Sequence, residues 1–252
     1  MTAALAAKAP LLVAAANGCA PGLPASFCHQ HSETSCVARN GFFCAGWAVD
    51  NFDRYTGPFF KHLWIVVISV TVGFAIALVL ALLSHRHRWL VPPLTGFTGI
   101  LYTVPSLAFF FLLLPITGFG TDTAVIALSA YTLQIIYRNI LAGLANVPPE
   151  AKDAGRGMGM TEQELLWRVE LPLAVPEIFA GLRIATVSTV AIATLAFFAG
   201  AGGLGDPLYK DITFKTNVII AGGLAILMAI TLDMLLLGLQ RLVTPWRRAR
   251  PA

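Results

Sequence analysis

Charge is what this sequence has least of. Only 12% of its 252 residues are Asp, Glu, Lys or Arg, whereas 57% are apolar. A soluble domain of this length usually carries about twice that share of charged residues. The composition therefore excludes an ordinary soluble globular protein. The formal net charge of +4 is small and gives no reason to expect a nucleic-acid partner.

Sequence motifs of ATP-binding and hydrolytic enzymes are also missing. No Gly-x-x-x-x-Gly-Lys-Ser/Thr pattern occurs, so the chain has no P-loop for ATP, and neither His-Glu-x-x-His nor Gly-x-Ser-x-Gly is found. The stretch "GAGGLG" at 200–205 satisfies a dinucleotide-binding pattern, but it follows an apolar run instead of a strand. We interpret these glycines as a tight turn or a close helix contact. We therefore expect this chain to be no enzyme and to hold no cofactor and no metal.

Long uncharged runs dominate the chain instead. A helix of about 20 apolar residues spans the hydrocarbon core of a bilayer. Runs of this kind, interrupted by charge only at Arg138 and Asp233, cover residues 63–83, 94–120, 123–144, 184–203 and 218–239. We predict an all-α membrane protein with about five transmembrane helices. It would consist of an N-terminal segment (1–61), a membrane domain (62–241) and a basic tail (242–252).

Lysine and arginine are distributed unequally between the connecting segments. The segments after the second and fourth runs hold only Lys210 and Lys215. The segments after the first, third and fifth runs hold Arg86, Arg88, Lys152, Arg156, Arg168, Arg183, Arg241, Arg247, Arg248 and Arg250. Because basic loops stay on the cytoplasmic side, we expect the C-terminus in the cytoplasm and the N-terminus outside the cell.

All four cysteines lie in the N-terminal segment, at Cys19, Cys28, Cys36 and Cys44. An even number on the oxidising side of a membrane predicts two disulfides, for which three pairings are possible. A metal site built on Cys28 and the nearby histidines His29 and His31 is the alternative. The spacing of these residues matches no usual zinc pattern.

The most polar part of the membrane domain is the stretch 150–183. Pro148 and Pro149 can end the preceding helix and begin a new one, in which Glu150 and Asp153 lie near the favourable N-terminus. We expect this short helix to end at the glycines Gly155, Gly157 and Gly159.

A second short helix is predicted directly after these glycines. Thr161 and Glu164 have the spacing of a capping box, which marks a helix start, and we expect Pro172 and Pro176 to stop the helix before the next membrane segment. Two capped helices at a glycine corner suit docking with a cytoplasmic protein better than a plain solvated loop does, although the loop remains the alternative.

These residues also carry a family resemblance. Glu150-Ala151, followed by Gly155 and later by Leu171-Pro172, resembles the loop signature of ABC importer permeases, which reads E-A-A, three residues, G, nine residues, I-x-L-P. Here Lys152 takes the third position and the second alanine is Ala154. The stretches "GMGMTEQELLWRVELPLAVPEIFAGLR", "YTVPSLA", "YRN" and "GAGGLG" are similar to permeases of the osmoprotectant importers, which carry glycine betaine, choline, carnitine or proline. The resemblance covers roughly 62–241.

The resemblance implies an ABC importer permease fold in a bacterial inner membrane, paired with a second, identical or homologous permease chain. It also implies a cytoplasmic ABC ATPase dimer that binds ATP and Mg²⁺, and an extracytoplasmic solute-binding protein. The coupling loop to the ATPase would include Glu150, Ala151, Ala154, Gly155, Gly157, Gly159, Thr161, Leu171 and Pro172. Two alternatives remain: a methionine-type amino-acid importer, which is similar around "GAGGLGD", and a membrane docking subunit that moves no solute.

Two further sets of residues are candidates for the transport path. Asp233 is a carboxylate within an apolar run, where an ionisable group is costly. It could form a gate or an ion pair with Arg138 or Arg183, or it could reach the inner interface. Aromatic side chains could line a path for a quaternary ammonium cation, although packing or lipid contact is the better explanation for most of them. They are Tyr102, Phe109, Phe110, Phe197 and Phe198.

Overall fold

The computed structural model describes residues 36–246. Cys19, Cys28, His29 and His31, like the tail residues from Arg247 onward, lie outside this range, so the predictions made on them stay predictions. Within the described range the chain forms helices and no strand, which confirms the all-α prediction. The long helices are α5 (Asp53–Arg86), α6 (Val91–Thr103), α7 (Ser106–Thr117), α8 (Thr121–Ala145), α11 (Leu171–Ala193) and α13 (Lys215–Val243).

The five predicted apolar runs correspond to four helices of membrane length and one bent pair of helices. Four helical segments in the described range are long and apolar enough to cross a bilayer: Asp53–Arg86, Thr121–Ala145, Glu162–Ala193 and Lys215–Val243. A fifth is the bent pair formed by α6 and α7. The first segment begins well before residue 62, because α5 already starts at Asp53.

The second run is not one straight helix, which corrects the sequence interpretation. α6 and α7 meet at an angle of 99°. The break lies at Val104 and Pro105, whose ψ angles of 128° and 131° are extended. The residue before a proline is pushed out of the helical region by the proline ring. The hydroxyl of Tyr131 on α8 donates a hydrogen bond to the freed carbonyl of Val104.

α8 is the central helix, and α5 and α11 both pack along it. The contacts are close because small residues lie at the crossings. A Cβ atom on Gly73 of α5 would lie 1.8 Å from Oγ1 of Thr132, and one on Gly181 of α11 would lie 2.4 Å from Cβ of Asn139. Small residues allow such close approach between membrane helices, where dispersion contacts and interhelical hydrogen bonds provide the stability.

The fourth run also differs from a single helix. α11 ends at Ala193, and the following residues form the short helix η3 (Ala196–Ala199) and a turn. In this turn Gly202 and Gly203 have φ angles of +75° and +86°, which favour glycine. A Cβ atom on Gly205 would lie 1.8 Å from the carbonyl oxygen of Thr194. The "GAGGLG" stretch is therefore both a tight turn and a close contact.

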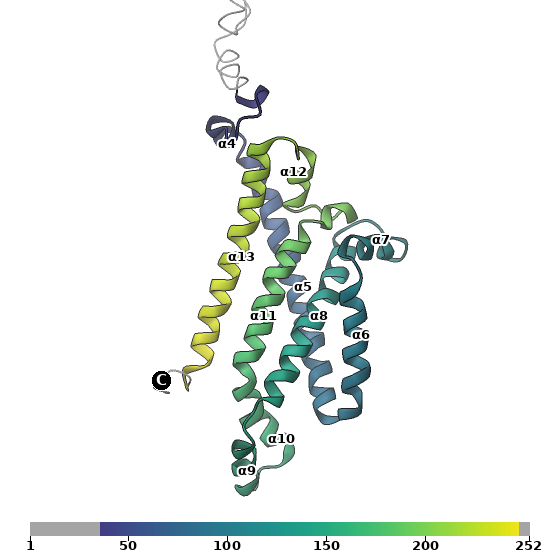
Figure 1. The fold of residues 1–252 in the computed structure, drawn as a ribbon, viewed down its shortest axis with the longest axis vertical. Coiled ribbons are helices and arrows are strands. Elements are labelled where there is room, and N and C mark those ends of the chain that lie inside the picture. Colours follow the sequence, from purple (N-terminus) through teal and green to yellow (C-terminus); the bar gives the residue numbers. More distant parts are fainter. Residues whose placement is uncertain (1–35, 247–252) are drawn as a thin grey trace, which may run out of the picture.

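The bundle has two distinct ends, which Figure 1 shows at its top and bottom. The cap end carries α4 (Ala45–Asp50) and α12 (Gly205–Lys210). The loop end carries the short helices between α8 and α11. α13 lies along the flank of the bundle and exposes many apolar side chains, among them Ile226, Ile230 and Met234.

A disulfide between Cys36 and Cys44 closes a loop at the cap end. Asn40 within this loop has a φ angle of +48°, which asparagine tolerates better than most residues. Its side-chain amide donates to the carbonyl of Thr213 (2.7 Å) and accepts from the backbone N–H of Lys215 (3.0 Å). The loop of residues 36–44 is thereby hydrogen-bonded to the connection between α12 and α13.

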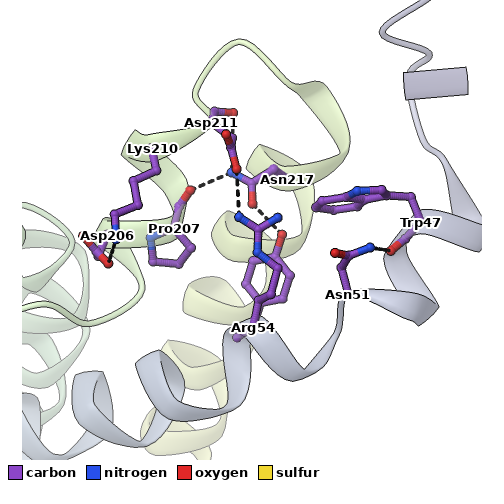
Figure 2. A network of polar contacts seen from close by, with 9 residues as sticks. Trp47, Asn51, Arg54, Asp206, Pro207, Lys210, Asp211 and Asn217 are labelled. Carbon is purple, nitrogen blue, oxygen red and sulfur yellow. Dashed lines mark hydrogen bonds and ion pairs between the residues drawn. The ribbon is translucent and has the colours of Figure 1, made fainter. Parts of the chain in front are cut away.

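Figure 2 shows a second set of contacts that fastens the same parts. The guanidinium of Arg54 pairs with the carboxylate of Asp211 at 2.9 Å and lies 5.5 Å from the ring centroid of Trp47. Asn217 donates to the carbonyl of Pro207 at 2.7 Å and accepts from the hydroxyl of Tyr55. These contacts join the start of α5 to α12 and to the start of α13.

Candidate functional site

Two short helices connect α8 to α11 at the loop end (Figure 1). α9 covers Pro149–Gly157 and α10 covers Glu162–Leu165. Pro149 lies in the first turn of α9, where its missing N–H would have no intrahelical partner anyway. Glu150 lies in the same turn, where the helix dipole favours a negative charge. The two short helices predicted for this loop are therefore present.

The corner between α9 and α10 depends on two different glycines. Gly159 has a φ angle of +79°, which turns the chain after α9. Gly155 is buried, and a Cβ atom on it would lie 2.5 Å from Cδ1 of Leu165. Gly157, in contrast, has open space where its Cβ would be. Gly159 thus sets the turn, and Gly155 sets how closely the second helix packs on the first.

The predicted capping box is confirmed. The backbone N–H of Glu164 donates to Oγ1 of Thr161 (3.3 Å), and the backbone N–H of Thr161 donates to the Glu164 carboxylate (3.0 Å). Across the corner, Nε of Arg156 donates to Glu162 at 3.2 Å. This hydrogen bond raises the pKa of Arg156 above its usual value.

The prediction that Pro172 and Pro176 stop the second helix is wrong. Leu166–Glu170 forms a π-helical turn (η2), and the helix continues through it into α11 without a break. Pro172 lies in the first turn of α11 and Pro176 lies inside it. A π-helical turn inside an α-helix shifts the hydrogen-bond register. Pro172 follows this turn and has no N–H to donate, and the shifted register does not require a hydrogen bond from this position. The second corner helix is therefore continuous with a membrane helix.

The turn geometry favours a second register for the loop signature. Counted from Asp153-Ala154-Gly155, three residues lead to Gly159, and nine more lead to Val169-Glu170-Leu171-Pro172. Both spacings of the signature are then satisfied, whereas counting from Glu150 satisfies neither, because three residues after Lys152 lead to Arg156. In this register the glycine of the signature is Gly159, the residue with positive φ. Glu150 and Ala151 then belong to the helix that leads into the signature.

The sequence interpretation missed Glu170, which is only 4% exposed. Its carboxylate lies 3.2 Å from Nζ of Lys152 on α9 and 2.7 Å from Nε2 of His85 on α5. In the sequence it is one more acidic residue in a polar stretch, and its neighbours lie 18 and 85 positions away. No local pattern distinguishes it from the exposed Glu162.

Within the bundle, Arg183 of α11 and Asp233 of α13 form a bidentate ion pair. Nε and one terminal nitrogen of the guanidinium each donate to a different carboxylate oxygen at 2.7 Å. The two side chains are 29% and 23% exposed. Two parallel charge-assisted bonds make this the strongest kind of ion pair between side chains. Arg138, the other partner considered for Asp233, is exposed on α8 and takes no part in this pair.

The five aromatic candidates do not come together in one site. Phe109 and Phe110 are buried in the core beside α8. Tyr102 makes an edge-on contact with Tyr131, with ring centroids 6.1 Å apart. Phe197 and Phe198 stack with Tyr209 near the cap end. Phe109 also contacts Tyr131 edge-on, with ring centroids 5.7 Å apart, so the ring contacts form two groups, one around Tyr131 and one around Tyr209.

Comparison with protein families identifies the family of this chain. The family model described as "Binding-protein-dependent transport system inner membrane component" matches residues 69–249. The chain belongs to this family. The match includes the whole loop-end corner and the Arg183–Asp233 pair, but it begins after the disulfide loop and the start of α5. With its long apolar helices, the chain is a multi-pass membrane protein.

Curated relatives narrow the family. An osmoprotectant import permease protein of Salmonella typhimurium, OsmW, is 40% identical over 204 residues, which cover 78% of this chain and 95% of the relative. A glycine betaine/carnitine/choline transport system permease protein of Bacillus subtilis, OpuCB, is 36% identical and covers 73% and 86% of the two chains. A choline transport system permease protein of the same organism, OpuBB, is 35% identical.

Solved structures confirm the permease fold. A chain of the MetNI methionine ABC transporter in an inward-facing conformation aligns with a TM-score of 0.63 over 73% of this chain and 94% of its own length. An amino-acid ABC transporter solved with histidines aligns with a TM-score of 0.65 over 77% and 95%. Sequence identity to these two chains is 22% and 19%, so the likeness concerns the fold alone.

Proposed function

We propose that this family member is the membrane-spanning permease subunit of an ATP-driven importer for compatible solutes such as glycine betaine, choline, carnitine or proline. The substrate class rests on the relatives, which are named as osmoprotectant, carnitine and choline permeases at 32–40% identity. The solved methionine transporter is less similar in sequence, at 22%. The compatible-solute importer is therefore favoured over the methionine-type importer.

The observation that carries the transport role is the loop-end corner. α9 and α10 form an ordered, capped pair, and α10 continues through the π turn into α11. A partner that pushes on the corner would therefore move a membrane helix directly. An ATPase dimer bound here would hold the ATP and Mg²⁺ that this chain has no P-loop to bind. A plain docking subunit would have no need for this continuity.

The proposed orientation places the loop end in the cytoplasm and the cap end outside the cell. Arg86, Arg88, Arg156 and Arg168 are exposed at the loop end, in keeping with the bias of basic loops toward the cytoplasm. The cap end would then face the solute-binding protein. Its disulfide between Cys36 and Cys44 is also in keeping with an oxidising compartment. A second permease chain, identical or homologous, would complete the path.

The Arg183–Asp233 pair is the proposed gate of this path. It lies ten residues before the end of α13, or about 15 Å from that end at the rise of an α-helix. Asp233 borders two hollows on the face shared by α11 and α13, one of about 660 Å³ and one of about 440 Å³. An ion pair that holds two membrane helices together and borders open space can separate when the helices move.

Reconstitution tests the proposed function directly. The permease would be purified with the ATPase and binding protein that co-purify with it, and placed in vesicles containing ATP. We expect ATP-dependent uptake of labelled glycine betaine or choline, and none without ATP. Uptake of methionine alone would show that the proposed solute class is wrong, while the proposed transport role would stand. No uptake of any solute by an assembled complex that hydrolyses ATP would support the docking subunit instead.

A further inference from the structure

Glu170 is a buried carboxylate at the point where three elements meet. It closes the π turn that leads into α11, and it contacts Lys152 on α9 and His85 at the end of α5. An unpaired charge buried to this degree would be strongly unfavourable, so the two basic side chains are what allows the carboxylate to stay there. Lys152 is further held by its hydrogen bond to the carbonyl of Leu144, at the end of α8 (3.4 Å).

The remaining contacts of α9 are apolar or exposed to solvent. Gly155 packs on Leu165 and Val169 through apolar atoms only. The ion pairs of Arg156 with Asp153 and Glu162 are exposed to solvent, and exposed pairs contribute little. The Lys152–Glu170 pair is thus the buried polar contact that fixes α9 to the start of the membrane helix α11.

The second contact of Glu170 extends the connection to another membrane helix. His85 lies in the last turn of α5, and its Nε2 is 2.7 Å from Oε2 of Glu170. Oε2 has no hydrogen bond of good geometry in the described part of the chain, so this contact is a close approach of the imidazole to the carboxylate. The carboxylate of Glu170 thus contacts one side chain of α5 and one of α9.

We infer that Glu170 is the joint that transmits movement of α9 to α5 and α11 together. This inference rests on the proposed transport function and assigns the mechanical step to a single positioning residue. A force on α9 would pass through Lys152 to the Glu170 carboxylate, then along the continuous helix into α11 and through His85 into α5. Without the joint, α9 could still bind its partner, but its movement would reach the membrane helices only through the apolar packing at Gly155, the exposed ion pairs and the backbone at either end.

The test compares Glu170→Gln, which keeps the shape of the side chain and removes its charge, with Lys152→Met. Arg86→Met is the matched control, because Arg86 is an exposed cation at the end of α5 beside His85. In the reconstituted complex we expect both joint variants to lower glycine betaine uptake per ATP hydrolysed at least fivefold. The control is expected to keep the ratio of the unmodified complex.

Hydrogen–deuterium exchange on the full chain in lipid nanodiscs gives a readout that needs no transport. We expect residues 149–157 to exchange faster in Glu170→Gln than in the unmodified chain, while α8 and α13 exchange equally. If Glu170→Gln does not fold, Lys152→Met carries the test alone. An unchanged uptake-to-hydrolysis ratio together with unchanged exchange in α9 would overturn the joint. Faster exchange in a complex that transports nothing would support the joint and count against the proposed function.

Discussion

Gly155 of α9 and Leu165 of α10 are so close that any side chain on Gly155 would have its Cβ 2.5 Å from Cδ1 of Leu165. The nearest atom belongs to the flexible tip of the leucine, which can rotate away from a single methyl group. It cannot make room for a branched side chain, because Met160 and Val169 occupy the neighbouring space at 3.5 and 3.7 Å. The packing distance between the two corner helices therefore depends on the absence of a side chain at residue 155.

The first prediction is that Gly155→Leu breaks the corner, whereas Gly155→Ala is tolerated. Overpacking of this kind typically costs about 1–3 kcal/mol. We expect Gly155→Leu to weaken co-purification with the ATPase and to abolish uptake, with the membrane helices still inserted. Gly157→Leu, where the Cβ meets open space, should have a smaller effect. Equal ATPase binding by Gly155→Leu and the unmodified protein would refute the role of the corner.

Helix capping at the corner gives the second prediction. Thr161→Ala removes the hydroxyl that accepts from Glu164 and should destabilise the α10 start by about 1 kcal/mol. Glu150→Ala only removes a favourable charge at the start of α9 and should cost about 0.3–1 kcal/mol. Exchange rates of residues 158–166 and 149–157 would measure the two effects separately. A larger effect of Glu150→Ala than of Thr161→Ala would contradict this order.

The third prediction is that Asp233→Asn destabilises the protein. This substitution leaves the Arg183 guanidinium without its anionic partner between two membrane helices. The pair is about one quarter exposed, so we expect a stability loss below the 3–5 kcal/mol that is typical of breaking fully buried pairs. Uptake should change together with stability. Thermal unfolding in nanodiscs and vesicle uptake are the measurements.

A matched substitution separates charge from geometry at this pair. Arg183→Lys keeps the positive charge but loses the bidentate contact. If the pair acts as a gate, Arg183→Lys should retain most of the stability but alter the uptake rate. A stable Asp233→Asn variant with normal uptake would remove the gate from the proposed mechanism.

The fourth prediction concerns the disulfide at the cap end. In the chain-entropy description, opening the loop between Cys36 and Cys44 should cost about 2–3 kcal/mol. Asn40 inside this loop is hydrogen-bonded to Thr213 and Lys215. The loss of stability should therefore extend to the connection between α12 and α13. Faster deuterium exchange over residues 205–217 in Cys36→Ser/Cys44→Ser would show it. Unchanged exchange there would mean that the Arg54–Asp211 pair and the Trp47 contact are enough to hold the connection between α12 and α13 in place.

Orientation in the membrane is the fifth prediction. Single cysteines introduced at Arg88 and Arg247, in a chain without its native cysteines, should be closed to a membrane-impermeant label in intact cells. A cysteine at Lys210, on the cap end, should be labelled, and it serves as the positive control. Labelling at 88 or 247 before the cells are opened would reverse the proposed topology.

Much of the fold follows from local properties of the sequence. Apolar runs of membrane length predict the five spans, because backbone groups in lipid can only be satisfied inside helices. The capping box at Thr161 and Glu164 is equally local, since both of its hydrogen bonds join residues three apart. Prolines are the least reliable of these signals. Pro105 breaks the second apolar run, whereas Pro172 and Pro176 do not break the helix Glu162–Ala193.

What the tertiary structure alone decided are the contacts between residues far apart in the chain. The sequence marked Asp233 as unusual and offered Arg138 and Arg183 as partners, and packing of α13 on α11 brings Arg183 to it. Glu170 gave no local signal at all, because its burial depends on α5 and α9 reaching it from positions 85 and 152. Periodicity and composition describe one segment at a time. The partner of a charge inside a bundle depends on which helices pack together and in what register, and that is settled only when the whole chain has folded.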